Sequence, residues 1–224
     1  MTVARSVRIM GIVNVTPDSF SDGGSFLDAA AAVNQARILI DQGADVIDIG
    51  GESTRPYAEP VSLKAELGRV IPVIKGIRAF SDIAISIDTS KAEVASQALA
   101  AGANIINDVT ALRKDPEMVE VVSNTSGEVI IMHMQGTPGT MQDDPHYRDV
   151  VAEVISFFRE RLEFIGDSGI DRLVAGRCDD GTFGLCRISP SLSPRPATGQ
   201  LASFAGRRRI SPLWPFWKCP ACGF

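Results

Sequence analysis

Short apolar runs alternate with longer amphipathic segments as far as about residue 175. The apolar runs are nearly continuous, which is typical of strands buried on both faces of a parallel sheet. The longer segments carry apolar residues at helical spacing, for example Ala30, Val33, Ala36 and Ile40. We predict strands at residues 7–13, 45–49, 83–87, 104–106 and 128–132, helices at residues 27–42, 62–80, 91–101, 116–123 and 147–168, and the start of a sixth strand at residues 172–175.

Helix ends and breaks are also marked in the sequence. Gly43 and Gly102 follow helical segments and are expected to end them, because glycine readily adopts the left-handed conformation of a C-cap. Ser90 is expected to cap the helix at residues 91–101. Pro72 lies inside the helix at residues 62–80 and is expected to kink it.

Polar residues recur just after the predicted strands. They are Asn14, Glu52, Asp88, Asn107 and His133. In a barrel of alternating strands and helices, the carboxyl ends of the strands meet on one rim, where the chemistry is found. An open doubly wound sheet is the competing architecture, but the first strand–helix turn has no Gly-x-Gly-x-x-Gly segment. We therefore predict an α/β fold, a TIM-type (β/α)8 barrel that is incomplete, with about five to six strand–helix units.

The chain changes composition near residue 176. Residues 177–224 hold all four cysteines, both tryptophans and six of the thirteen prolines, and their net charge is +5 in a chain whose total is −5. Prolines exclude regular helix and inner strand, and the apolar residues there have no period. We predict a partial barrel domain at residues 1–176 and an irregular or disordered tail at residues 177–224.

Composition excludes several classes of protein. The chain of 224 residues is 45% hydrophobic and 22% charged, which is ordinary for a soluble globular protein. Its acidic balance gives no reason to expect nucleic acid as a partner. No apolar stretch is long enough to span a membrane, and the N-terminus does not read as a signal peptide. A cytoplasmic location is therefore expected.

The loop at residues 14–24 carries the strongest chemical signal. It combines an amide, two carboxylates, three hydroxyls and two glycines, which suits a divalent cation and a phosphorylated ligand. Four further polar segments follow at residues 50–56, 85–89, 105–108 and 132–138. In order and spacing, the five segments resemble the signatures of the dihydropteroate synthases over about residues 7–172.

The resemblance implies a transferase of folate biosynthesis that binds pterin. Such an enzyme condenses 6-hydroxymethyl-7,8-dihydropterin pyrophosphate with para-aminobenzoate and releases pyrophosphate. Its partners would be these small molecules, its cofactor Mg²⁺, and a homodimer would be possible if the barrel were complete. The pterin-binding methyltransferase domains are an alternative, as is an inactive pterin-binding or interaction fragment.

The resemblance also implies roles for single residues. Asp88 and Asn107 would read the pterin edge, and Asn14 and Asp22 would contact Mg²⁺ and pyrophosphate. Arg55, Thr54 and Asp22 would serve catalysis. The remaining substrate contacts would come from Phe20 and Pro56, which would flank the para-aminobenzoate ring, and from Ser21, with Thr54 and Arg55 touching the same site. Residue types alone leave other roles open: Arg55 as a solvated loop residue, Phe20 in the core, and His133 either in the core or in the pterin pocket wall.

The family pattern stops at the predicted sixth strand. The Asp-Pro-Gly segment expected after this strand is absent, as are the later Lys, Ser-Arg and Arg-x-His elements. The shift towards Arg, Pro, Ser, Cys and Trp is typical of an out-of-frame reading of a GC-rich gene. We therefore predict a frameshift near residues 173–177, with a naturally evolved Pro-rich tail as the alternative, and little or no activity of this chain. The pair Cys219 and Cys222 lacks the further ligands that zinc needs.

Overall fold

The computed structural model describes residues 8–16, 24–53, 58–138, 140–141, 145–166, 173–179 and 182–188. Strands and helices alternate within these ranges in the predicted order. The strands are β1 (Met10–Asn14), β2 (Val46–Gly50), β3 (Ala84–Asp88), β4 (Ile105–Asp108), β5 (Glu128–His133), β6 (Leu173–Asp179) and β7 (Thr182–Ile188). The helices are α1 (Gly24–Asp41), α2 (Leu63–Arg78), α3 (Ala92–Ala101), α4 (Met118–Ser123) and α5 (Val150–Gly166).

One curved sheet holds all seven of these strands, in the order in which they occur along the chain. Strands β1 to β6 are parallel, and β7 pairs with β6 in the antiparallel sense. Arg8 and Glu128 form an ion pair of 2.5 Å that joins the chain just before β1 to the start of β5. Such a contact requires the sheet to curl as a barrel does, and the predicted incomplete barrel is confirmed.

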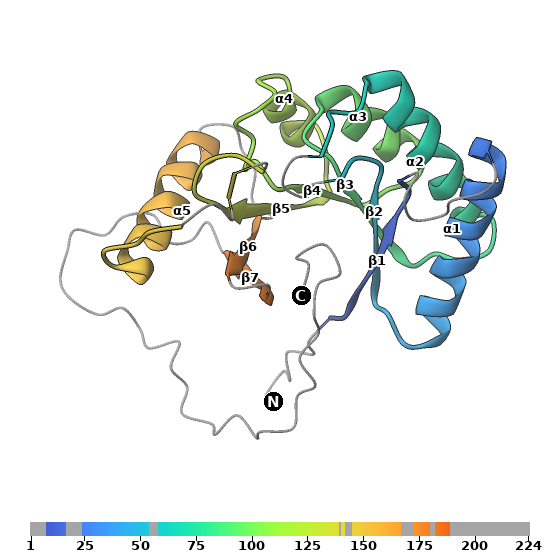
Figure 1. Ribbon diagram of the computed structural model, residues 1–224, viewed down its shortest axis with the longest axis horizontal. Coiled ribbons are helices and arrows are strands. Elements are labelled where there is room, and N and C mark those ends of the chain that lie inside the picture. Colours follow the sequence, from blue (N-terminus) through green and yellow to red (C-terminus); the bar gives the residue numbers. More distant parts are fainter. Residues whose placement is uncertain are drawn as a thin grey trace.

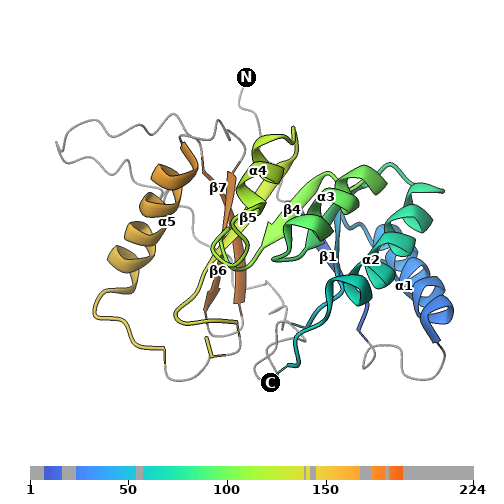
Figure 2. The ribbon, with the colours of Figure 1, turned by 90° about the horizontal axis from the view of Figure 1, so that it is seen from above.

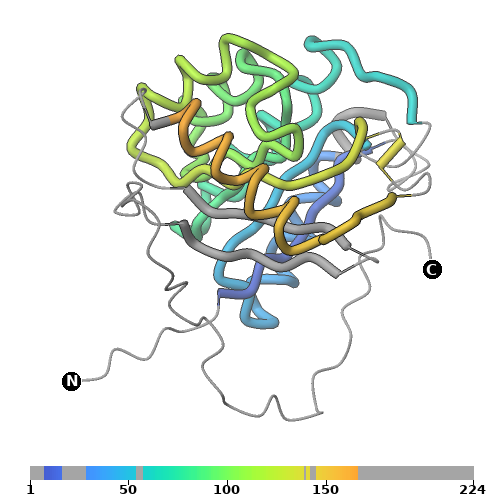
Figure 3. The backbone as a smooth tube through the Cα atoms, turned by 90° about the vertical axis from the view of Figure 1, so that its left-hand side faces the viewer, coloured from blue at the N-terminus to red at the C-terminus, as the bar shows by residue number. Residues whose placement is uncertain are grey.

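The helices form a layer on the outside of the curled sheet. Helices α1 to α4 cover its outer face (Figure 1), and the view from above shows them side by side along it (Figure 2). Helix α5 lies at the opposite end of the molecule from α1, and it faces the viewer, in orange, when the molecule is turned onto that side (Figure 3). The helices thus leave the concave face of the sheet open to the interior of the curl.

The two faces of the sheet bury different side chains. Ile47 and Ile49 of β2 are fully buried and belong to the main core with Val70 and Ile74 of α2. Burying a side chain of this size contributes about 1.5–3 kcal/mol, so the helix–sheet interface supplies most of the driving force. The opposite face carries a smaller cluster inside the curl of the sheet: Val46, Ile105 and Ile130, with Met10 and Ala84 packed against it.

Most helix ends follow the predictions, with one correction. Gly43 and Gly102 adopt positive φ angles of 96° and 116° after α1 and α3. Ser90 does not cap α3, because Lys91 holds the N-cap position and forms no side-chain cap bond. Asp115 takes this part instead, since its Oδ2 accepts from the Ala92 amide at 2.8 Å. The cap comes from a residue 23 positions away, which no local pattern indicates.

Helix α2 runs through Pro72 without ending. Its N-cap is Ser62, whose hydroxyl accepts from the Ala65 amide at 3.3 Å. Tertiary packing thus outweighs the loss of one helical hydrogen bond at Pro72, because Val70, Val73 and Ile74 around it are fully buried.

The first part of the predicted irregular tail is strand. β6 extends to Asp179, and β7 turns back along it over residues 182–188, with Leu173 opposite Ile188. The prediction of irregular structure from residue 177 is therefore wrong for these residues. Strand pairing here requires neither period nor helix propensity, only extended backbone beside an open sheet edge. Residues 189–224 lie outside the described part of the chain.

Arg78, at the end of α2, is expected to matter for stability. Its guanidinium donates to four oxygens near the amino ends of the strands: Gly102 O at 2.9 Å, Ser81 O at 3.1 Å, Ile83 O at 2.6 Å and Asn104 Oδ1 at 2.6 Å. We expect Arg78→Met to lower the free energy of unfolding by about 2 kcal/mol, because charged hydrogen bonds are lost and carbonyl groups lose their donors. Urea unfolding measures this, and Lys75→Met on the same helix is the control. An equal effect of both substitutions would contradict the assignment.

None of the helices in the described part of the chain is long and apolar enough to cross a membrane.

Candidate functional site

The carboxyl ends of four neighbouring strands line up in one row, and three of them carry a polar side chain there. Asn14 lies opposite Gly50, Gly50 opposite Asp88, and Asp88 opposite Asn107. A side chain at Gly50 would begin 3.4 Å from Asn14 Oδ1 and 3.6 Å from Asp88 Oδ2. Both oxygens therefore face the space above Gly50, inside the curl of the sheet. The predicted gathering of Asn14, Asp88 and Asn107 on one rim is confirmed.

Asp48 determines how the Asn107 amide is oriented. The Asn107 Nδ2 donates to the two Asp48 carboxylate oxygens at 3.3 and 3.5 Å. The Asn107 Oδ1 is buried and accepts no hydrogen bond within the described structure. Because a carboxylate can only accept, the amide nitrogen must turn towards Asp48 and the oxygen is left for another donor. Asn107 thus presents an acceptor beside the Asp88 carboxylate.

The row has an unusual electrostatic state. Burial and then the neighbouring Asp48 and Asp108 carboxylates hold the pKa of Asp88 well above its ordinary value. Burial also raises the pKa of Asp48, although the hydrogen bonds from Asn107 act in the opposite direction. Carboxylates held close together in a partly desolvated place bind protons or a donor-rich ligand more readily than isolated ones. The site is therefore built to receive N–H groups.

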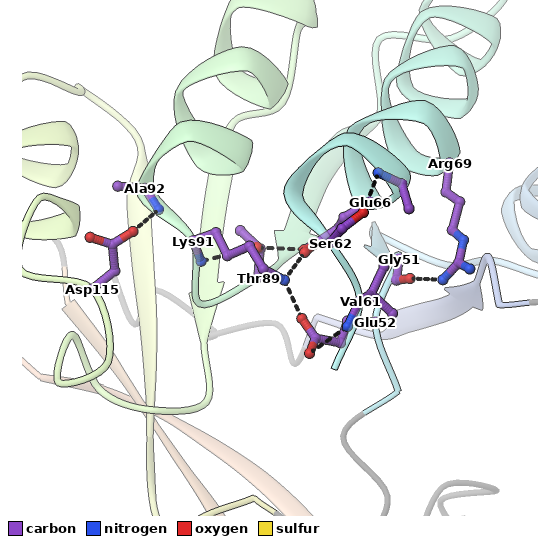
Figure 4. Close-up of polar contacts among 11 residues, drawn as sticks. Gly51, Glu52, Val61, Ser62, Glu66, Arg69, Thr89, Lys91, Ala92 and Asp115 are labelled. Atoms are coloured by element: carbon purple, nitrogen blue, oxygen red, sulfur yellow. Dashed lines mark hydrogen bonds and ion pairs between the residues drawn. The ribbon is translucent and has the colours of Figure 1, made fainter. Parts of the chain in front are cut away.

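Glu52, just after β2, joins a second polar network on the outer side of the rim (Figure 4). Lys91 forms ion pairs with both Glu52 and Glu66, and the Thr89 hydroxyl donates to Glu66 at 2.6 Å. Burial alone would raise the pKa of Glu52, but the Lys91 ammonium outweighs burial and lowers it. Arg69 completes the network by donating to Gly51 O at 2.8 Å. The Glu52 carboxylate is thus bound by Lys91 and by the Val61 amide.

His133 packs against aromatic residues of helix α5 and of the segment before it. Its ring lies edge-on to Phe157 with centroids 4.9 Å apart and is tilted against Tyr147 at 5.8 Å. The neighbouring β5 residue Met132 belongs to a cluster with Val109 on the opposite face of the sheet. Of the two interpretations of His133, these contacts favour the structural one.

Several predicted site residues lie outside the described part of the chain. These are Phe20, Ser21, Asp22, Thr54, Arg55 and Pro56. Three residues that now belong to the site were not singled out from the sequence: Asp48, Glu66 and Lys91. Asp48 did leave a signal, because it is the one charged residue in the apolar run of β2.

Metal binding would rest on few protein groups. The described residues include no cluster of three or more His, Cys, Asp or Glu side chains that could hold an ion. Asn14 offers an amide oxygen at the rim. This donor fits Mg²⁺, which usually takes one or two oxygens from the protein and the rest from water and substrate phosphates.

A family model described as "Pterin binding enzyme" matches residues 10–175. The chain belongs to the pterin-binding enzymes. The matched region of this chain includes every strand from β1 to β5, and it includes Asn14, Asp88 and Asn107 at their carboxyl ends. The site described above therefore lies inside the part of the chain that is shared with the family.

Curated relatives and solved structures agree. The chain is 48% identical over 162 residues to a dihydropteroate synthase of Synechocystis sp., covering 72% of this chain and 56% of the relative. It is 49% identical to the Escherichia coli K12 enzyme, covering 73% and 57%. The Xanthomonas albilineans dihydropteroate synthase, solved with 4-aminobenzoic acid, superposes with a TM-score of 0.68 at 50% identity over 75% of this chain and 60% of that one. The chain thus spans little more than half the length of the curated relatives it matches.

Proposed function

We propose that this chain carries the pterin-binding half of a dihydropteroate synthase. The observation that supports the proposal most is the pair of Asp88 and Asn107, in which Asp48 binds the Asn107 amide nitrogen and leaves the Asn107 oxygen without a donor in the described structure. A pterin presents an amino group and ring N–H groups on one edge. Adjacent carboxylate and amide oxygens match such an edge, and each unmatched group would cost a buried hydrogen bond.

The reaction itself would occur above this pair. The para-aminobenzoate amine attacks the methylene carbon that is attached to the pterin, and the bond from this carbon to the pyrophosphate oxygen breaks. The oxygen leaves with the bonding electrons, and the amine loses a proton. We propose that Asn14 and Asp22 hold the Mg²⁺, which when bound neutralises charge on the departing pyrophosphate.

The two loops at the rim would complete the site. We propose that Arg55 and Thr54 bind the pyrophosphate group, because guanidinium and hydroxyl donors stabilise the charge that develops on it. Phe20 and Pro56 would flank the para-aminobenzoate ring, and Ser21 would hydrogen-bond beside it. Two relatives support these ligands: the X. albilineans enzyme was solved with 4-aminobenzoic acid and that of Burkholderia cenocepacia with 7,8-dihydropteroate. The latter superposes with a TM-score of 0.66 at 40% identity, over 76% of this chain and 58% of that one.

The binding step can be tested on the chain as it stands. We expect the purified protein to bind 6-hydroxymethyl-7,8-dihydropterin pyrophosphate, and to bind it more tightly with Mg²⁺ than with EDTA, because the metal would join Asn14 to the phosphates. Isothermal titration calorimetry measures both affinities, with ATP as a control ligand that carries phosphates but lacks the amino and ring N–H edge that a pterin presents. Equal affinity for the two ligands would contradict a pterin site. The homodimer and the cytoplasmic location stay predictions.

A further inference from the structure

Glu52 lies at the start of the second rim loop, which is the segment at residues 53–60 between β2 and α2. Its side chain also contacts Val61, just after the end of this loop. Its Oε1 accepts from the Val61 amide at 3.4 Å, and its Oε2 pairs with Lys91. A single carboxylate thus connects the two ends of the loop at residues 53–60 with the start of α3. Figure 4 shows Glu52 between Val61 and the start of α3.

Helix α2 forms the other wall of this junction. Glu66 is fully buried and accepts from both Lys91 and the Thr89 hydroxyl. Gly51 lies so close to this helix that a side chain there would begin 2.8 Å from Val70 Cγ1. The loop stem is therefore pressed against α2, and only glycine fits at the point of contact.

The charges make Lys91 the central group. A fully buried carboxylate is stable only with a partner, and Lys91 is the cation that contacts Glu66 within the described structure. The Lys91 side chain keeps 21% of its surface exposed, and that of Glu52 keeps 19%. The buried Glu66 carboxylate thus binds Lys91, and Lys91 in turn binds the more exposed Glu52 on the loop stem.

We propose that Lys91 is a positioning residue that fixes the stem of the second rim loop through Glu52. The latch made of Glu52, Glu66 and Lys91 would thus hold the described ends of this loop, residues 51–53 and 61, against α2 and α3. The consequence for ligand binding rests on the proposed function, which assigns the pyrophosphate group to Thr54 and Arg55, the residues that follow Glu52 closely in the sequence. The effect on the loop itself does not.

Hydrogen exchange tests the effect on the loop. We expect Lys91→Met to speed amide exchange at residues 51–53 and 61 by about tenfold or more, while β3 and β4 keep their protection, because a local restraint is lost and the sheet is not. Lys91→Arg should restore protection, since it keeps the charge and the reach. Lys64→Met on exposed α2 surface is the matched control. Unchanged exchange at the stem in Lys91→Met would overturn the proposal.

A second variant separates positioning from charge balance. Lys91→Met leaves Glu66 buried without its cation, so the chain can lose stability as a whole. The double variant Lys91→Met/Glu66→Gln removes that charge, and we expect its strands to stay protected while the stem still exchanges faster than in the unmodified chain. If the double variant also recovers the stem, Lys91 serves only to balance Glu66 and the proposal is wrong.

Ligand binding provides the final readout. In the double variant we expect affinity for the pterin pyrophosphate to fall about tenfold and affinity for 6-hydroxymethylpterin, which has no pyrophosphate, to stay the same. An equal loss for both ligands would contradict a role confined to the loop. If the unmodified chain binds neither ligand, the proposed function fails, whereas the exchange data still decide whether the latch exists.

Discussion

Replacing Asp88 with asparagine is expected to weaken pterin binding by about a hundredfold while making the folded chain more stable at neutral pH. The amide introduced in place of the carboxylate would set an N–H group or a weaker acceptor against the pterin donors, in a site whose other amide, Asn107, is already oriented by Asp48. The same substitution removes a carboxylate that is crowded by burial and by Asp48 and Asp108. Replacing one of several crowded, buried carboxylates at a binding site typically raises the free energy of unfolding by about 1 kcal/mol.

The direction of the pH dependence follows from the raised pKa of Asp88. The folded chain binds this proton more tightly than the unfolded chain does, so the stabilisation is fully present below the unfolded pKa and is lost as pH rises through the folded pKa. The gain in the free energy of unfolding that Asp88→Asn gives over the unmodified chain should therefore be small in acid and grow towards neutral pH. Urea unfolding across this range measures it, and Asp41→Asn, at an exposed helix position, is the control. A destabilised Asp88→Asn protein at neutral pH would contradict the electrostatic assignment.

The second large effect is expected from completing the barrel. The chain alone should release pyrophosphate from the pterin substrate and para-aminobenzoate at least about a hundredfold more slowly than a chimera in which residues 1–172 continue into the C-terminal part of the E. coli relative. The chain matches 57% of that relative, and the family elements expected after β6 are absent from its sequence. Loss of even one preorganised group that stabilises the transition state costs about a hundredfold or more in rate.

The comparison requires that both proteins be folded. Circular dichroism and the binding assay for pterin pyrophosphate establish this before rates are measured, and the chimera carrying Asp88→Asn provides the inactive reference. Comparable rates for the chain and the chimera would refute both the roles assigned to the absent elements and the proposed frameshift near residues 173–177. Reading the gene in its other frames gives an independent check, because one of them should restore Asp-Pro-Gly.

Local sequence was sufficient for the elements and for part of the site. Strands such as β2 and β3 could be predicted because a strand buried on both faces must be apolar along its whole length. Asp88 and Asn107 could be placed on the same rim because parallel strands end at the same edge of a sheet, and the registers confirm it. His133 could not be assigned, because the face on which a strand-end residue lies depends on the pairing of β5 with its neighbours.

Other features were decided only by tertiary structure. The Asp48 contact that orients Asn107 joins residues 59 positions apart, the pair of Lys91 and Glu66 joins residues 25 apart, and Asp115 replaces the local Ser90 as the partner of α3. Strand β7 forms in a segment without periodicity, because an open edge accepts any extended backbone. By itself the sequence determined that the strands β1 to β5 form and in which order they alternate with helices, since burial acts on each run of residues separately. The partners of its buried charges depend on which distant segments the fold brings together, and only the tertiary structure decided them.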